Sequence, residues 1–145
     1  MNPQKGNPKA AIVYCLDPDI DEAVGSFLDS QGLHAGTFTR HPIQGGPLNI
    51  RDVEKSLGFV INYLGVRTIW LIGHVICRAM ELELGKNDDD AHAQCLRGAR
   101  SWCHQRFPSD VGVRAILMRS CEPNQKEQWR FDRLTYTGYV TIIRI

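Results

Sequence analysis

Short apolar runs alternate with amphipathic stretches along most of this sequence. Residues 10–16, 68–73 and 112–118 are almost continuously apolar, which is the pattern of strands covered on both faces. Between them, the stretches 20–28 and 53–64 place apolar side chains at steps of three and four, as on one face of a helix. This alternation predicts an α/β fold, in which a central parallel sheet carries helices on both faces through right-handed crossovers.

The remaining stretches of the sequence complete this outline. Residues 33–39 are a more polar strand candidate near a sheet edge, and residues 40–49 are expected to be a loop because they hold two prolines and paired glycines. A helical pattern runs over 91–107. Residues 128–145 alternate and have a turn signal at 137–138, which predicts an antiparallel addition of two strands at the C-terminal end of the sheet.

Acidic residues mark the starts of two predicted helices. Asp19 and Glu22 have the spacing of a capping box, and Pro18 is expected outside the helix because proline cannot sit in its interior. The run 88–90 consists of three aspartates, which suit the positive end of a helix dipole.

Length and charge restrict the class of protein. The 145 residues are enough for one domain, which we expect at 10–145 after a short polar segment at 1–9. Because the net charge is only +1, we expect no nucleic-acid partner. Because no apolar run is long enough to span a bilayer, we expect no membrane partner. The N-terminal segment has no apolar signal core, so we expect a cytoplasmic protein whose five cysteines are thiols, metal ligands or nucleophiles.

Three potential metal ligands fall at the ends of predicted strands. Cys15 ends the first apolar run, and His74 and Cys77 follow the run at 68–73. The carboxyl ends of neighbouring parallel strands meet at one edge of a sheet, so the fold can bring the three together. Two thiolates and one imidazole suit zinc, and three protein ligands leave the fourth position open, as in catalytic sites. The alternative is that both cysteines are small core residues.

A second group of possible ligands lies on the helix predicted at 91–107. Cys95 and Cys103 fall on one side of it, with His92 and His104 nearby, so a second metal site is conceivable. A core stripe that contains cysteines is the favoured interpretation, because buried free cysteine is common.

The segments around the three ligands resemble the β-class carbonic anhydrases. Gly73-His74-Val75-Ile76-Cys77 matches their GHxxC motif, and Cys15-Leu16-Asp17-Pro18-Asp19 matches a first strand that ends in Cys-x-Asp-x-Arg. Residues 40–46 loosely match an arginine-containing, glycine-rich loop, and residues 131–138 match a late strand and turn. The resemblance implies a β-carbonic-anhydrase-like fold, a Zn²⁺ ion on Cys15, His74 and Cys77, and a homodimer or higher oligomer.

The resemblance also implies an activity. Its substrate would be a small molecule, and the reaction would be reversible hydration of carbon dioxide to bicarbonate by a zinc-bound hydroxide, at a low rate. The same site could instead hydrolyse carbonyl sulfide or carbon disulfide, or the chain could be a non-catalytic zinc-binding domain of the same fold.

Two further residues carry catalytic expectations. Asp17 is implied to accept a hydrogen bond from the hydroxide or to displace it, and Asp19 stands where the family has the arginine that holds this aspartate off the metal. We therefore expect Asp17 to be freer to close the site. Arg40 is a candidate replacement for that arginine or a binder of bicarbonate; the alternative is a solvated loop arginine.

Overall fold

The computed structural model describes residues 8–75, 77–122 and 125–145, without the side chains of 121, 122 and 125–127. Six strands form one sheet in the order β2-β1-β3-β4-β5-β6. The first four are parallel to one another, and β5 and β6 are antiparallel additions. The predicted fold class is therefore confirmed. The strands are β1 (Ala10–Cys15), β2 (Phe38–Ile43), β3 (Thr68–His74), β4 (Gly112–Glu122), β5 (Gln125–Leu134) and β6 (Tyr139–Arg144).

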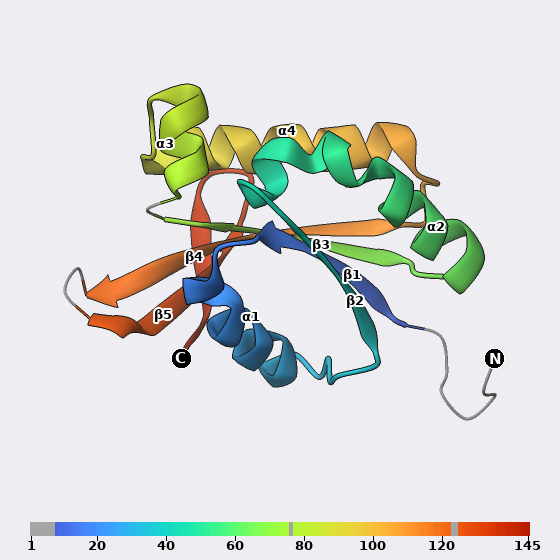
Figure 1. Cartoon of the computed structure of the whole chain (residues 1–145), viewed down its shortest axis with the longest axis horizontal. Helices are drawn as coiled ribbons and strands as arrows, with labels where there is room; N and C mark the ends of the chain where they lie inside the picture. The colour runs from blue at the N-terminus through green and yellow to red at the C-terminus, as the bar shows by residue number, and fades with distance from the viewer. Residues whose placement is uncertain (1–7, 76, 123–124) are drawn as a thin grey trace.

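Helices cover both faces of the sheet (Figure 1). On one face lies α1 (Pro18–Ser30); on the other lie the 3₁₀ helix η1 (Gly46–Val53), α2 (Glu54–Leu64) and α4 (Asp89–Arg106). The short helix α3 (Arg78–Leu84) follows β3. None of the helices in the described residues is long and apolar enough to cross a membrane.

Each face of the sheet has its own hydrophobic core. Under α1, the ring of Phe27 stacks on Phe131 with centroids 4.2 Å apart and meets Trp70 edge-on at 5.6 Å. On the opposite face, apolar side chains of α2 and α4 pack on alternate residues of the same strands. The nearly continuous apolar runs of β1 and β3 thus result from burial on both faces.

The start of α1 differs from the predicted capping box. Asp17 is the N-cap, and its side chain accepts a hydrogen bond from the backbone N–H of Asp19 at 2.9 Å. Pro18 occupies the first turn of the helix, where a missing N–H costs nothing and the fixed φ angle suits helical geometry. The prediction that Asp19 caps the helix and that Pro18 lies outside it is therefore wrong.

Strand β2 lies later in the chain than predicted. Residues 33–37 form a turn region, and the strand extends through Pro42 into the predicted loop. Proline is tolerated because β2 is at the edge of the sheet, where one side of the strand needs no ladder hydrogen bonds. The rest of the predicted loop forms η1, which leads directly into α2.

The sheet topology determines where a site can form. Strand β1 lies between β2 and β3, with Tyr14 opposite Ile72 in parallel register. The carboxyl ends of β1 and β3 therefore lie side by side at one edge of the sheet. The chain continues from β1 into α1 and from β3 toward α3.

Candidate metal centre

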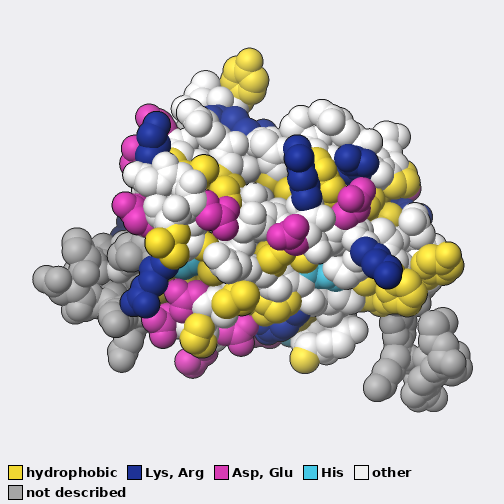
Figure 2. All heavy atoms as spheres, turned by 45° about the horizontal axis from the view of Figure 1, so that its top comes forward, with side chains coloured by type: hydrophobic (Ala, Val, Ile, Leu, Met, Phe, Trp, Pro, Cys, Tyr) yellow, Lys and Arg dark blue, Asp and Glu magenta, His cyan; other side chains and the backbone are white. Residues whose placement is uncertain are grey.

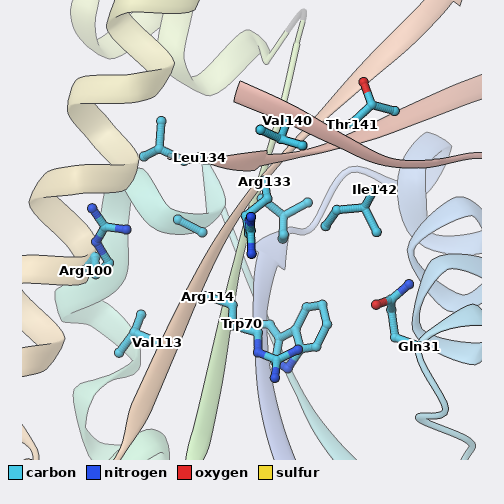
Figure 3. Close-up of a pocket in the computed structure, with 12 residues that line it drawn as sticks. Gln31, Trp70, Arg100, Val113, Arg114, Arg133, Leu134, Val140, Thr141 and Ile142 are labelled. Atoms are coloured by element: carbon cyan, nitrogen blue, oxygen red, sulfur yellow. The ribbon is translucent and has the colours of Figure 1, made fainter. Parts of the chain in front are cut away.

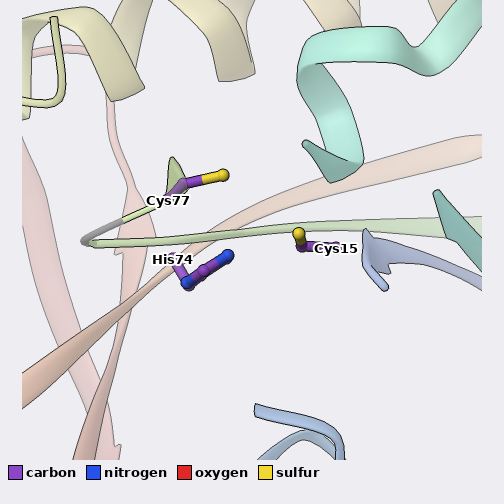
Figure 4. Close-up of side chains that lie close together, drawn as sticks. All are labelled: Cys15, His74 and Cys77. Atoms are coloured by element: carbon purple, nitrogen blue, oxygen red, sulfur yellow. The ribbon is translucent and has the colours of Figure 1, made fainter. Parts of the chain in front are cut away.

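The three predicted ligands come together at the carboxyl ends of β1 and β3. One ligand atom from each of Cys15, His74 and Cys77 lies within 4.8 Å of the other two, and all three residues are buried. Figure 4 shows the side chains directed toward a common space. Ligand atoms around a tetrahedral zinc ion are about 3.5–3.8 Å apart, given Zn–S and Zn–N bonds of about 2.3 and 2.05 Å. A small inward shift of these side chains would therefore suffice to hold the ion.

The ring of His74 is oriented for metal binding. Its Nδ1 donates a hydrogen bond to the backbone oxygen of Val75 at 3.1 Å, because a carbonyl can only accept. That bond fixes the tautomer in which Nε2 carries the lone pair. Nε2 is buried and has no hydrogen-bond partner in the described structure. Since an unsatisfied buried polar atom is costly, a ligand such as a metal ion is the natural partner for Nε2.

The sulfur of Cys15 lies in an environment that favours the thiolate. A hydrogen bond from the Cys77 thiol, together with the backbone N–H groups of Asp17 and Gly45, outweighs burial and lowers the pKa of Cys15 to about 4. The thiolate is the form that binds metals. Without a metal, the two sulfurs hold one proton between them, so the same hydrogen bond and burial raise the pKa of Cys77.

Helix α3 positions Cys77. The residue is its N-cap, in an extended conformation, and the nearby N–H groups of Ala79 and Met80 pull the pKa of its thiol downward, against the effect of Cys15. A cation bridging both sulfurs would replace the shared proton and allow both to ionise.

A small cavity adjoins the ligands. It has a volume of about 10 Å³, and its walls include Gly45, Gly73, His74, Cys77 and His92. That volume holds about one water molecule. An added Cβ at Gly73 would lie 3.8 Å from His92 Nδ1, which is an ordinary van der Waals contact, so this wall has room for a methyl group.

Neither of the two predicted catalytic residues joins the metal cluster. Asp17 is half-buried and caps α1 through Asp19, as described above. Arg40 extends from β2 toward α1, where its guanidinium donates to the Tyr14 hydroxyl at 3.2 Å and to Asp21 Oδ1 at 3.3 Å. It also lies over the ring of Phe38. These contacts tie the edge strand to α1, and none of them reaches the three predicted metal ligands.

The second group of possible ligands is dispersed. Cys103 lies in the core between α4 and the sheet, where burial raises the pKa of its thiol to about 12. Burial likewise raises the pKa of Cys95 to about 11. His92 Nε2 donates to Asn87 Oδ1 at 2.7 Å, and burial lowers the pKa of His92 to about 4. Among the described residues, only Cys15, His74 and Cys77 form a metal-ligand cluster.

Sequence reasoning missed the role of Gly46. Its φ angle is +56°, and an added Cβ would lie 2.9 Å from the backbone nitrogen of Cys15. The glycine therefore lets η1 pass directly against the end of β1, beside the predicted ligand Cys15. The Gly45-Gly46 pair was the available signal, but it indicates a turn and not a close approach.

Solved structures of carbonic anhydrases share this fold. The carbonic anhydrase from Glaciozyma antarctica superposes with a TM-score of 0.61 at 15% identity, over 95% of this chain and 83% of that one. The beta-carbonic anhydrase isoform I from Trichomonas vaginalis gives a TM-score of 0.56 at 19% identity, over 94% and 84%. A carbon disulfide hydrolase, in its apo form, gives 0.58 at 12% identity, over 79% and 75%.

Sequence comparison adds nothing to this result, since no family model and no curated protein matches the chain. The similarity is therefore one of fold, carried by the superposition on the solved carbonic anhydrases. The chain has the fold of the β-carbonic anhydrases, as a divergent example of it.

Proposed function

We propose that this chain is a zinc enzyme that reversibly hydrates carbon dioxide to bicarbonate, with Cys15, His74 and Cys77 as the metal ligands. The observation that carries the proposal is the buried Nε2 of His74, which has no hydrogen-bond partner among the described residues and lies beside two sulfurs. Soft sulfur and imidazole donors suit zinc, and a set of three leaves one coordination position open. When bound, the metal would lower the pKa of a coordinated water and so supply a nucleophile near neutral pH.

We assign Asp17 the role of orienting the water that attacks carbon dioxide. It lies two positions after Cys15, and one of its oxygens accepts the N–H of Asp19. That bond restrains the carboxylate as the family's arginine would, because it ties the carboxylate to the first turn of α1. The other oxygen can then accept a hydrogen bond from the attacking water and orient it. We therefore propose an open fourth position rather than one closed by Asp17.

Arg40 takes no part in this proposal. Its contacts with Tyr14 and Asp21 account for its position, and they place its charge on the α1 side of β2.

Hydrolysis of carbon disulfide or carbonyl sulfide is the second candidate. The superposition on a carbon disulfide hydrolase favours it. Hydration of carbon dioxide and hydrolysis of carbon disulfide or carbonyl sulfide each begin with the addition of water to a linear triatomic carbon compound. The same three metal ligands and Asp17 would therefore serve either function.

We also propose that the protein works in a reducing compartment, such as the cytoplasm. The four cysteines whose side chains are described are free thiols. Cys15 and Cys77 lie close enough that oxidation would compete with metal binding, so reducing conditions preserve the site.

Metal analysis and kinetics test the proposal together. The purified protein should contain about one zinc per chain and should accelerate carbon dioxide hydration in a stopped-flow assay. His74→Ala and Cys77→Ala should lose both properties. Cys103→Ala is the matched control, because Cys103 is buried in the core outside the cluster, and it should keep both.

Other outcomes distinguish the alternatives. Stoichiometric zinc in a Cys15→Ala, Cys77→Ala double variant would contradict the ligand assignment. Turnover of carbon disulfide without hydration of carbon dioxide would favour the second candidate. Zinc bound at this site with neither activity would favour a non-catalytic zinc-binding domain.

A further inference from the structure

A basic notch lies beside the sheet, away from the metal centre. Strand β5 ends at Leu134, and its pairing with β4 begins at Ile116. Residues 112–115 of β4 therefore pair with β3 but not with β5. The turn after β5 is held toward α4, where Arg97 donates to the backbone oxygens of Thr135 and Tyr136. The space left beside β4 is a cavity of about 580 Å³.

Three arginines from three elements line this notch. They are Arg100 on α4, Arg114 on β4 and Arg133 on β5, and Figure 3 shows them around the uncovered part of β4. Among the residues whose side chains are described, no aspartate or glutamate lines the notch. None of the ion pairs found among the described residues includes any of the three.

This concentration of positive charge is local. The whole chain has a net charge of only +1. On the molecular face shown in Figure 2, basic and acidic side chains are interspersed. An anion in the cavity would be attracted by all three guanidinium groups.

The other walls of the notch are suited to an organic ligand. Arg114 lies 4.8 Å above the ring of Trp70, which fixes one guanidinium. Aliphatic side chains, including Val113 and Leu134, form apolar walls, and Gln31 adds a neutral polar group. A volume of about 580 Å³ lies within the range of small-molecule sites, which are mostly apolar with a few convergent polar groups.

We propose that this notch binds a small organic anion through carboxylate or phosphate groups held by Arg100, Arg114 and Arg133. Guanidinium groups recognise both anions through paired hydrogen bonds. The site is separate from the metal centre: Trp70 and Arg114 face each other in the sheet four residues before His74 and Met118 do. Four residues span about 13 Å of strand. The proposal does not depend on the function assigned above.

Calorimetric titration tests the site with two probes, citrate for carboxylates and pyrophosphate for phosphates. The wild-type protein should bind at least one of them at a single site, and the tighter probe identifies the preferred group. An Arg114→Gln, Arg133→Gln double variant should bind that probe at least about tenfold more weakly, since it loses two charge-assisted contacts to the anion. Both side chains are exposed, so thermal unfolding should be unchanged.

Arg144→Gln is the matched control. Arg144 is also exposed and without an ion pair in the described structure, but it lies outside the notch. It should leave binding within about twofold of wild type. Three results would overturn the proposal: no binding of either probe to the wild type, undiminished binding in the double variant, or an equal loss in Arg144→Gln, which would indicate non-specific charge attraction.

Discussion

At the scale of single residues, Asp17 combines a structural and a proposed catalytic role that substitutions can separate. Asparagine caps helices about as well as aspartate, so Asp17→Asn should change the free energy of unfolding by only a few tenths of a kcal/mol. It should nevertheless lower carbon dioxide hydration strongly, because the neutral amide accepts a hydrogen bond from the attacking water less well. Chemical denaturation and stopped-flow kinetics measure the two effects.

Asp17→Ala completes this comparison. It removes the bond to the Asp19 N–H and should cost about 1 kcal/mol in stability. Asp88→Ala, which removes the corresponding cap of α4, should cost a similar amount but leave hydration unchanged. Full activity in Asp17→Asn would show that Asp17 only caps the helix.

The close approach at Gly46 leads to a second prediction. Gly46→Ala combines a positive φ angle with a backbone clash at Cys15, so it should displace η1 or the end of β1. We expect a loss of at least about 1 kcal/mol of stability and weaker zinc retention against a chelator. Gly58→Ala is the control: Gly58 is in α2 with open space around it, and alanine there should stabilise by about 0.5–1 kcal/mol. Equal zinc retention in both variants would contradict this account.

Buried His41 makes stability depend on pH. Its Nδ1 donates to Ser56 Oγ, and its Nε2 accepts from the Thr39 hydroxyl, which is the pattern of a neutral ring. Burial lowers the pKa of His41 in the folded state, so the unfolded chain takes up the proton at higher pH. The contribution of His41 to the free energy of unfolding is therefore complete above about pH 6.5, the pKa of histidine in the unfolded chain. It is lost as the pH falls from that value through the lower pKa of folded His41.

Unfolding measured at about pH 7.5 and about pH 5 tests this prediction. The wild type should lose more stability between the two values than His41→Gln, which cannot be protonated. His92 contributes in both proteins, so the difference between them isolates His41. Equal losses in the two proteins would show that His41 is not responsible.

The three proposed metal ligands could be found by sequence reasoning, whereas the residues that support them could not. Cys15, His74 and Cys77 stand at the ends of two strongly apolar strands, so strand position alone placed them at one sheet edge. The Gly46 contact depends on how η1 passes the end of β1, and no local pattern encodes that path. The capping role of Asp17 was missed because Asp19 with Glu22 offered a competing, equally good local signal.

At the scale of elements, helix α1 is fixed to the sheet by an aromatic cluster. Phe27 is fully buried between Phe131 and Trp70. Phe27→Ala should therefore cost about 3–5 kcal/mol, through lost burial and the cavity left behind. Phe59→Ala is the matched control, because Phe59 is 54% exposed on α2, and it should cost less than about 1 kcal/mol. Similar losses in the two variants, measured by chemical denaturation, would contradict this packing model.

Elements with strong periodicity were predicted well, and weakly patterned ones were not. The apolar strands β1 and β3 and the amphipathic helix α4 fall within a residue or two of the predicted ranges. Strand β2 was misplaced because Pro42 is a loop signal in isolation, and only its position at the sheet edge makes it acceptable. Helix η1 was missed for a similar reason, since its Gly-Gly-Pro start indicates a loop.

At the scale of the whole molecule, the two edges of the sheet differ. Edge strand β2 contains Pro42 and Arg40, which disfavour pairing with a further strand. The opposite edge, β6, contains no proline and exposes Val140 and Ile142, which are 50% and 38% accessible. In the described residues, only β5 pairs with β6. We therefore expect a second copy of the chain to associate at β6, forming a homodimer.

Sedimentation velocity at micromolar concentration tests this prediction. The wild type should sediment as a dimer, and a Val140→Lys, Ile142→Lys double variant should sediment as a monomer, because charged lysines on an edge strand oppose pairing. Tyr136→Lys is the control. Tyr136 is 96% exposed in the turn before β6. Its replacement removes a large exposed side chain without changing the strand itself, so the dimer should persist. A wild-type monomer would contradict the edge model, and a dimer that survives the double variant would place the interface on another surface.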